Sequence, residues 1–209
     1  RVLFRSLNDR AAGHAYDDHV TVEIAQENAE DYIAAAQALN ESGVDVVSLQ
    51  HEFGIFGGAS GEHILLFCAE LKCPLITTLH TVLERPSPDQ RRVMERLIAL
   101  SARLVVMSQK GREILTRTFP AAKHKISVIA HGAPDRPLSN GESAKRRLEL
   151  AGREVVLTFG LLSPNKGIES VIEALPRVAA AQPNVTYVVL GATHPHLVER
   201  EGEAYRASL

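Results

Sequence analysis

The residues best suited to chemistry lie in the segment TFGLLSPNKGIE, residues 158–169. The apolar run before it predicts a buried parallel strand, and the apolar spacing after it predicts an amphipathic helix. A turn between a strand and a helix aims free backbone N–H groups and the positive end of the helix dipole at one point. A lysine there, Lys166, would complete a site for phosphate or another anion. The alternative is an ordinary turn with a solvated lysine, and these residues alone do not separate the two.

Polar and small residues also follow other predicted strands, at the point where each strand ends. They are His51 and Glu52, His80 and Thr81, Ser108, His131 and Gly132, and later Thr193, His194 and His196. In an open α/β sheet, ligands bind at the carboxyl ends of the strands. A single histidine there is more often bonded to a nearby carbonyl, but the repetition predicts a ligand site along this edge. Gly57 and Gly58 indicate close backbone approach by a ligand, or a tight turn before a helix.

The elements that must position these residues alternate along the chain. Strands are predicted at residues 19–24, 44–49, 75–79, 104–107, 126–129, 154–158 and 185–190. Helices are predicted at residues 27–42, 60–72, after Ser87, and at 109–118, 143–150, 166–182 and 197–209. This rhythm is typical of an α/β fold with a doubly wound parallel sheet, and it restarts after a stretch rich in Pro, Gly and Asn. We therefore predict two Rossmann-like domains, 7–135 and 154–209, joined by a linker and short helix, 136–153.

Composition excludes several classes of protein. The chain has 209 residues, of which 45% are hydrophobic and 23% charged, and its net charge is -2. These values are typical of a soluble globular protein and give no reason to expect a nucleic-acid partner. Cys68 and Cys73 have the spacing of neither a zinc pair nor a redox pair, which favours buried thiols in a reducing compartment. No apolar run is long enough to span a bilayer and no signal peptide is visible, so we predict a cytoplasmic protein.

The two ends of the sequence predict an internal fragment of a longer protein. Residues 1–6, RVLFRS, match one reading frame of a sequencing-library adapter, so we expect them to lie outside the fold. The helix predicted at residues 197–209 stops without a cap. We expect both domains to be truncated and this chain, by itself, to be inactive.

Six segments in order, HEFGIFGG, TTLHT, LVVMS, ISVIAHGAPD, FGLLSPNKGIE and YVVLGATHP, resemble the family 4 glycosyltransferases, which have the GT-B fold. The resemblance covers nearly everything from Val44 onward. It implies an N-terminal domain for a sugar, lipid or small-molecule acceptor and a C-terminal domain for a nucleotide-sugar donor. It also implies transfer of a hexose with retention, without metal or other cofactor, in carbohydrate biosynthesis. Peripheral contact with the inner face of the membrane is left open.

The resemblance implies roles for individual residues. Lys166 aligns with the lysine of the family's G-R-L-x-x-x-K-G turn, where it would bind the donor diphosphate and stabilise charge on the leaving group. His80, in the family's T-x-H position, would hydrogen-bond the transferred sugar. Further donor-binding residues implied by the resemblance are Gly57, Gly58, Gly160, Ser163, Gly167 and Gly191. On the acceptor side the residues are His51, Glu52 and His131.

The chain departs from the family pattern at one position of this turn. The family's arginine falls at Leu161, which leaves Lys166, backbone N–H groups and Ser163 for the diphosphate. The family's E-x7-E carboxylates would lie beyond Leu209, and the nucleotide, the sugar and the acceptor stay open. Two alternatives remain: a non-catalytic GT-B-like binding module, or another GT-B enzyme such as a sugar phosphorylase or nucleotide-sugar epimerase. No strand is followed by G-x-G-x-x-G, which argues against a dinucleotide-dependent oxidoreductase.

Overall fold

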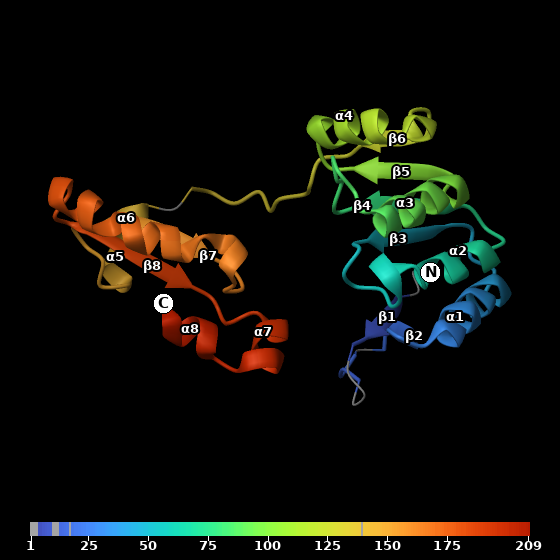
Figure 1. Ribbon diagram of the computed structural model, residues 1–209, viewed down its shortest axis with the longest axis horizontal. Coiled ribbons are helices and arrows are strands. Elements are labelled where there is room, and N and C mark those ends of the chain that lie inside the picture. The colour runs from blue at the N-terminus through green and yellow to red at the C-terminus, as the bar shows by residue number, and fades with distance from the viewer. Residues whose placement is uncertain (1–3, 10–12, 17, 139) are drawn as a thin grey trace. The chain divides into compact units, whose positions relative to one another are not determined.

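A computed structural model describes residues 4–9, 13–16, 18–138 and 140–209. The contacts within the chain divide it into two compact units, Arg1–Ala133 (unit 1) and Pro134–Leu209 (unit 2) (Figure 1). Each unit has its own parallel sheet and its own helices, and each is described by itself. The predicted α/β class is confirmed.

Unit 1 is built on a four-stranded parallel sheet with the strand order β3-β4-β5-β6. Its strands are β3 (Val47–His51), β4 (Leu75–Leu79), β5 (Arg103–Val106) and β6 (Ile126–Val128). A separate parallel pair is formed by β1 (Phe4–Asn8) and β2 (Val20–Ala25). Because all four strands of the larger sheet run the same way, their carboxyl ends lie at one edge.

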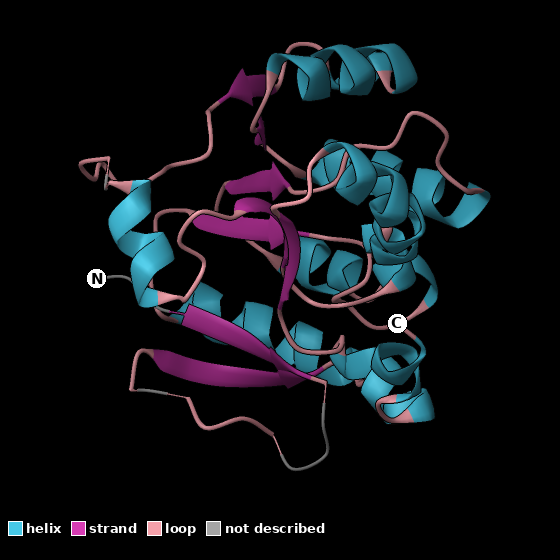
Figure 2. Cartoon of the chain, turned by 90° about the vertical axis from the view of Figure 1, so that its left-hand side faces the viewer, coloured by secondary structure: helices cyan, strands magenta, loops and turns pink. Residues whose placement is uncertain are grey.

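The α-helices in the described part of unit 1 are α1 (Ala29–Glu41), α2 (Ile64–Glu70), α3 (Pro88–Leu100) and α4 (Gln109–Thr118). Three of them, α1, α3 and α4, begin at a residue whose side chain caps the helix, whereas α2 has no such cap among the described residues. At α3 the Ser87 side chain accepts from the N–H of Gln90, whose own side chain accepts from the N–H of Ser87. This reciprocal pair satisfies two amides that the helix cannot, and fixes where α3 starts. Figure 2 shows the helices of the chain in cyan and its strands in magenta.

The core of unit 1 forms where the helices pack on the sheet. Val93, Met94, Leu97 and Ile98 of α3 are buried, as their spacing predicts. From the sheet, Leu104 and Val106 of β5 join the same cluster. Thr77 of β4 is fully buried beside Ser101, and their hydroxyls are 2.8 Å apart.

The C-terminal end of α3 is held by a lysine from a later segment. Lys125 donates from Nζ to the carbonyl oxygens of Ile98 at 2.8 Å, Ser101 at 2.7 Å and Ala99 at 3.3 Å. An ammonium group at this position satisfies carbonyls that lack intrahelical partners and lies at the negative end of the helix dipole.

We therefore expect Lys125→Met to destabilise unit 1 by about 1–3 kcal/mol, the range for part-buried hydrogen bonds to a charged group. Methionine keeps most of the apolar stem but has no ammonium. Urea unfolding followed by circular dichroism measures the difference. Lys123→Met is the matched control, because Lys123 is exposed on the same loop. Equal stability of the two variants would contradict a capping role.

Unit 2 contains a two-stranded parallel sheet, β7 (Glu154–Phe159) and β8 (Val185–Leu190). Its helices are α5 (Gly141–Arg147), α6 (Ile168–Ala181), α7 (Pro195–Glu201) and α8 (Ala204–Ser208). A small core joins the buried side chains of Leu162, Ile168 and Tyr205. The buried strand predicted at the start of this unit is wrong in one respect. Leu157 and Phe159 are 55% and 72% exposed, because two strands and their helices leave much of the apolar surface of unit 2 uncovered.

Two predictions about the ends of the chain are also wrong. Residues 4–6 lie inside the fold, since they belong to β1, in which Ser6 pairs with Glu23 and Leu7 with Ile24. Residues 1–3 lie outside the described part of the chain. The helix predicted at residues 197–209 is two short helices, because Gly202 adopts a left-handed conformation with φ of 62° and ends the first of them.

Two details of the predicted helices differ as well. The helix predicted from Ser60 starts later, at Ile64. Ser60 lies in a short 3-10 turn (η1, Ala59–Gly61) with φ of 55°, which does not belong to an α-helix. The apolar spacing of α1 predicts an inward stripe of Ala29, Ile33, Ala36 and Leu39. In the structure Tyr32 and Ala35 are buried as well, whereas Ile33 is only half-buried. None of the helices in the described part of the chain is long and apolar enough to cross a bilayer.

Candidate functional site

The carboxyl edge of the unit 1 sheet joins the end of β3 to the residues after β4. Nε2 of His80 lies 2.9 Å from Oε1 of Gln50, and the backbone N–H of His80 donates to the carbonyl of His51 at 3.0 Å. The hydroxyl of Thr81 donates to Oε2 of Glu52 at 2.7 Å. The residues at the end of β3, 50–52, therefore hold the two residues that follow β4, 80–81. The structure brings together the predicted residues His51, Glu52 and His80.

The strand β3 runs two residues further than predicted, to His51 instead of Leu49. Its side chains alternate between two environments. Ser48 and Gln50 are exposed, whereas Leu49 and His51 are buried. The loop position predicted for His51 is therefore wrong: its imidazole lies on the apolar face of the strand, and an acceptor-lining role does not follow from this position.

His51 is fully buried between two aromatic rings. Its ring is edge-on to Phe53, with centroids 5.0 Å apart, and stacked on Phe56 at 5.8 Å. Neither ring nitrogen has a hydrogen-bond partner among the described residues. Burial lowers the pKa of His51 from 6.5 to about 4, with Glu52 opposing the shift and His80 adding to it. The neutral imidazole is thus the form that the fold accommodates.

This burial predicts that unit 1 loses stability in mild acid. Between pH 6.5 and 4 the unfolded chain binds a proton on His51 that the folded chain does not, so stability falls as pH falls through this window. The full effect is about 3 kcal/mol at 1.4 kcal/mol for each unit of pKa. Urea unfolding at a series of pH values measures it. In His51→Leu, which cannot titrate, we expect the corresponding part of the pH slope to disappear; an unchanged slope would show that other groups cause it.

The glycines of the loop after β3 are required by the protein's own packing. A Cβ on Gly57 would lie 2.0 Å from the backbone oxygen of Gln26, so no other residue fits there. The N–H of Gly57 donates to the hydroxyl of Tyr32 at 3.1 Å, and that hydroxyl donates to Gln26 O at 2.8 Å. The N–H of Gly58 donates to Glu27 Oε2 at 3.3 Å. The close approach predicted here is thus made by the chain itself, and a diphosphate contact stays a prediction.

Two other predicted strand-end residues lie apart from this cluster of contacts. His131 is exposed in the segment that follows β6, where Nδ1 lies 3.2 Å from the carbonyl of Gly132. Ser108 caps α4, because its side chain accepts from the N–H of Gly111 at 3.0 Å. An acceptor role for His131 stays a prediction, and Ser108 has a structural role.

In unit 2 the predicted anion-binding turn connects β7 to α6. The N–H of Gly160 donates to Leu190 O at 3.0 Å and that of Leu162 to Ala192 O at 2.8 Å, which extends the pairing past β7. A 3-10 turn (η3, Pro164–Lys166) follows, and Gly167, with φ of 64°, opens α6. The left-handed conformation explains the need for glycine at this position.

Lys166 is exposed and folds back over the start of the turn. Its Nζ lies 3.5 Å from the point that a Cβ on Gly160 would occupy, and Gly160 has φ of 123°. The N-cap of α6, Gly167, offers no side chain to the amides of the first turn. A lysine in a turn that leads into a helix N-terminus without a side-chain cap can bind an anion such as a phosphate.

The remaining predicted donor residues shape this turn. A Cβ on Gly191 would lie 1.7 Å from Gly160 O, so Gly191 lets the two strand ends cross closely. The hydroxyl of Ser163 donates a hydrogen bond to Oδ1 of Asn165. Leu161 is 45% exposed where the family pattern has arginine, whereas Leu162 is buried. Lys166 is therefore the cation of the turn.

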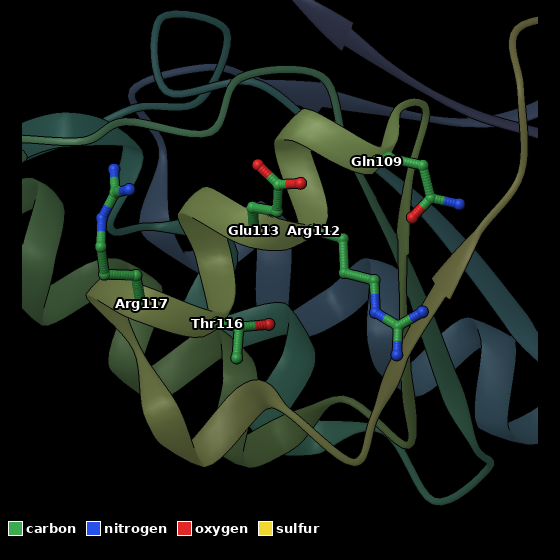
Figure 3. Close-up of a pocket in the computed structure, with 5 residues that line it drawn as sticks. All are labelled: Gln109, Arg112, Glu113, Thr116 and Arg117. Carbon is green, nitrogen blue, oxygen red and sulfur yellow. The ribbon is translucent and has the colours of Figure 1, made fainter.

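A surface hollow elsewhere contains none of these residues. Its walls are five polar side chains of α4, shown in Figure 3: Gln109, Arg112, Glu113, Thr116 and Arg117. Arg117 is paired with Glu84 at 3.1 Å. The hollow is a shallow feature of one helix surface and does not overlap with the predicted site.

Sequence reasoning did not single out two residues that hold the unit 1 site. Gln50 contacts His80, and Tyr32 anchors the glycine loop. The alternation of Ser48, Gln50 and Glu52 with buried residues was the available signal for Gln50, since a strand that continued to His51 would place these polar side chains on one face. Nothing in the local pattern marks Tyr32 as a support of the glycine loop, because Gly57 lies 25 residues away from it.

The chain is similar to a family model, to curated proteins and to solved structures. A family model described as Glycosyltransferase Family 4 matches residues 16–135. A D-inositol 3-phosphate glycosyltransferase of Segniliparus rotundus is 31% identical over 157 residues, which cover 68% of this chain and 35% of the relative. Crystal structures of Anabaena HepE are similar in fold. The structure with UDP has a TM-score of 0.63 at 19% identity, covering 90% of this chain and 52% of HepE. The structure with UDP-glucose has a TM-score of 0.59 at 19% identity, covering 91% and 53%. The chain spans about a third of the length of the curated relatives it matches.

Proposed function

Because the chain belongs to glycosyltransferase family 4, we propose that the protein transfers a hexose from a nucleotide-sugar donor to a carbohydrate, lipid or small-molecule acceptor. The observation that carries the proposal is the position of Lys166, whose ammonium group lies over Gly160 and whose backbone directly precedes Gly167, the N-cap of α6. A diphosphate leaving group gains negative charge as its bond to the sugar breaks. A fixed cation and oriented N–H groups stabilise that charge more in the transition state than in the ground state.

His80 has the second role in the proposed reaction, a hydrogen bond to the transferred sugar. Its side chain is exposed at the carboxyl edge of the unit 1 sheet and is held by Gln50, so it is both accessible and oriented. Retention of the anomeric configuration and independence of metal are part of the proposal through the family resemblance. Neither role requires the side chain of His51, which is buried.

The test is a calorimetric titration of the full-length gene product with UDP, GDP and ADP. We expect one of the three to bind, and UDP is the first probe because HepE was solved with UDP and with UDP-glucose. Binding that depends on Lys166 supports a nucleotide-sugar donor and identifies its nucleotide. If no nucleotide binds, the proposal is wrong, and a non-catalytic module or a phosphorylase takes its place; a sugar-release assay with and without inorganic phosphate separates these two.

The acceptor is tested with the nucleotide sugar that the titration selects. Inositol 3-phosphate belongs in the panel, because two relatives of the chain are named D-inositol 3-phosphate glycosyltransferase. Product formation is followed by mass spectrometry. Transfer to any acceptor supports a transferase, whereas hydrolysis of the donor alone shows that the correct acceptor is missing from the panel.

A further inference from the structure

We propose that Gln50 is a positioning residue, which holds the imidazole of His80 so that Nδ1 is presented to the transferred sugar. The inference rests on the proposed function, in which His80 contacts that sugar. It concerns a residue outside the set that the family resemblance implies, and it follows from the contacts at the carboxyl edge of the unit 1 sheet.

The hydrogen bond between the two side chains has a defined donor and acceptor. Nε2 of His80 lies 2.9 Å from Oε1 of Gln50. An amide oxygen only accepts, so in this arrangement Nε2 carries the hydrogen. In the neutral ring Nδ1 is then a lone-pair acceptor, and Nδ1 has no hydrogen bond to any described residue of unit 1. Gln50 thus decides which ring nitrogen faces a ligand.

The amide of Gln50 also has a partner on its own strand, Ser48. Nε2 of Gln50 donates to the hydroxyl oxygen of Ser48 at 3.3 Å, so the arrangement with Oε1 toward His80 gives both ends of the amide a partner. Ser48, Gln50 and His80 share one face, because side chains of a strand alternate and Gln50 is paired in register with Thr78 of β4. The neighbouring residue His51 has its side chain on the other face, in the core. The amide therefore approaches the ring from the exposed face of the sheet.

The backbone that carries the His80 ring is held in place by the end of β3. The N–H of His80 donates to His51 O at 3.0 Å, and the next residue is held through its side chain by Glu52. With the main chain fixed on both sides, the torsions of the His80 side chain are its remaining freedom. An exposed side chain without a partner populates several rotamers, and ordering it when substrate binds lowers the rate and the affinity. The Gln50 contact removes this freedom in advance.

The kinetic test uses Gln50→Met in the full-length gene product. Methionine has a similar length and no acceptor oxygen. We expect turnover of the nucleotide sugar to fall about tenfold, the effect of one lost neutral hydrogen bond, while the nucleotide dissociation constant stays unchanged. We expect Gln50→Asn to behave like Gln50→Met, because the shorter asparagine side chain does not bring its amide to Nε2 of His80. Gln37→Met is the matched control: the same substitution at an exposed glutamine of α1.

A double-mutant cycle shows whether Gln50 acts through His80. If it does, adding Gln50→Met to His80→Ala reduces turnover no further than His80→Ala alone. A further loss of about tenfold in the double variant would show that Gln50 acts on the substrate or the fold directly, and would overturn the inference. Thermal melting of all variants detects any loss of folded protein.

A spectroscopic measurement tests the positioning without any transfer assay. In protein labelled with 15N-histidine, the ring nitrogens of His80, assigned with His80→Gln, should show the shifts of a single tautomer with the hydrogen on Nε2. In Gln50→Met they should move toward the values of a freely exchanging ring. If His80→Ala leaves transfer intact, the proposed role of His80 fails, whatever the spectra show. If His80→Ala abolishes transfer but Gln50→Met retains wild-type spectra and turnover, the inference fails and the proposed function stands.

Discussion

Replacing Lys166 by alanine is expected to weaken nucleotide-diphosphate binding by about 10- to 100-fold, which corresponds to one charge-assisted hydrogen bond of about 1.5–3 kcal/mol. Turnover is expected to fall further, by about 10²- to 10³-fold, because the lost cation acts most strongly on the charge that develops on the leaving group. The reason for so large an effect lies in Leu161. Where the family has a second cation, this chain has an apolar side chain, so no neighbouring residue of the turn can replace the ammonium group.

Calorimetry gives the affinity, and nucleotide release from the donor sugar gives the turnover. Lys166→Arg keeps the charge and should retain part of both. Lys145→Ala is the matched control, since Lys145 belongs to unit 2 and pairs only with Glu142 at 3.6 Å among its described neighbours. Unchanged nucleotide affinity in Lys166→Ala would refute the diphosphate assignment. An equal loss in Lys145→Ala would point to a general electrostatic effect of unit 2.

The sequence predicted best those elements whose limits are set locally. The helix α4 begins and ends where predicted, at Gln109 and Thr118, and α3 begins with the predicted cap at Ser87. In both cases a side chain within three residues of the start satisfies the first amides, so the information is contained in the segment itself. The strand β8 also has its predicted limits, Val185–Leu190.

Predictions failed where a distant segment decides the outcome. The end of β3 was placed at Leu49, but pairing with β4 extends the strand through His51 opposite Leu79. Because the strand is two residues longer than predicted, His51 lies in the core and not in a loop. Gly57 was associated with a ligand, yet the atom that requires a glycine there is the backbone oxygen of Gln26. No local pattern contains either fact, because both depend on which segments the fold brings together.

The residues of the candidate site also differ in whether the local sequence or a distant segment determines their position. The turn around Lys166 was recognisable because its small residues, its lysine and the following helix are adjacent in sequence. The support of His80 was not, because Gln50 lies 30 residues earlier in the chain. A residue such as Lys166 belongs to a motif that can be recognised in a short segment. A residue such as Gln50, which positions another side chain, can be identified only when the pairing of the strands is known.

The second large effect is expected for His80→Ala, which should lower turnover by about 10²-fold, the lower range for loss of one oriented polar group at a reacting centre. Nucleotide affinity should stay within about twofold of wild type, because the proposed contact is made to the sugar and not to the diphosphate. This pattern is the reverse of that for Lys166→Ala, in which affinity and turnover both fall. The two variants therefore separate the contacts to the two halves of the donor.

A transfer assay with the nucleotide sugar measures the turnover, and calorimetry with the free nucleotide measures the affinity. His124→Ala is the matched control, since His124 is an exposed histidine of unit 1 on the loop before β6. An equal loss of turnover and nucleotide affinity in His80→Ala would mean that the imidazole supports the sheet edge through Gln50 and does not contact the sugar. A loss confined to turnover, together with a wild-type melting temperature, leaves contact with the transferred sugar as the explanation, because the backbone bond of His80 to His51 remains in the alanine variant.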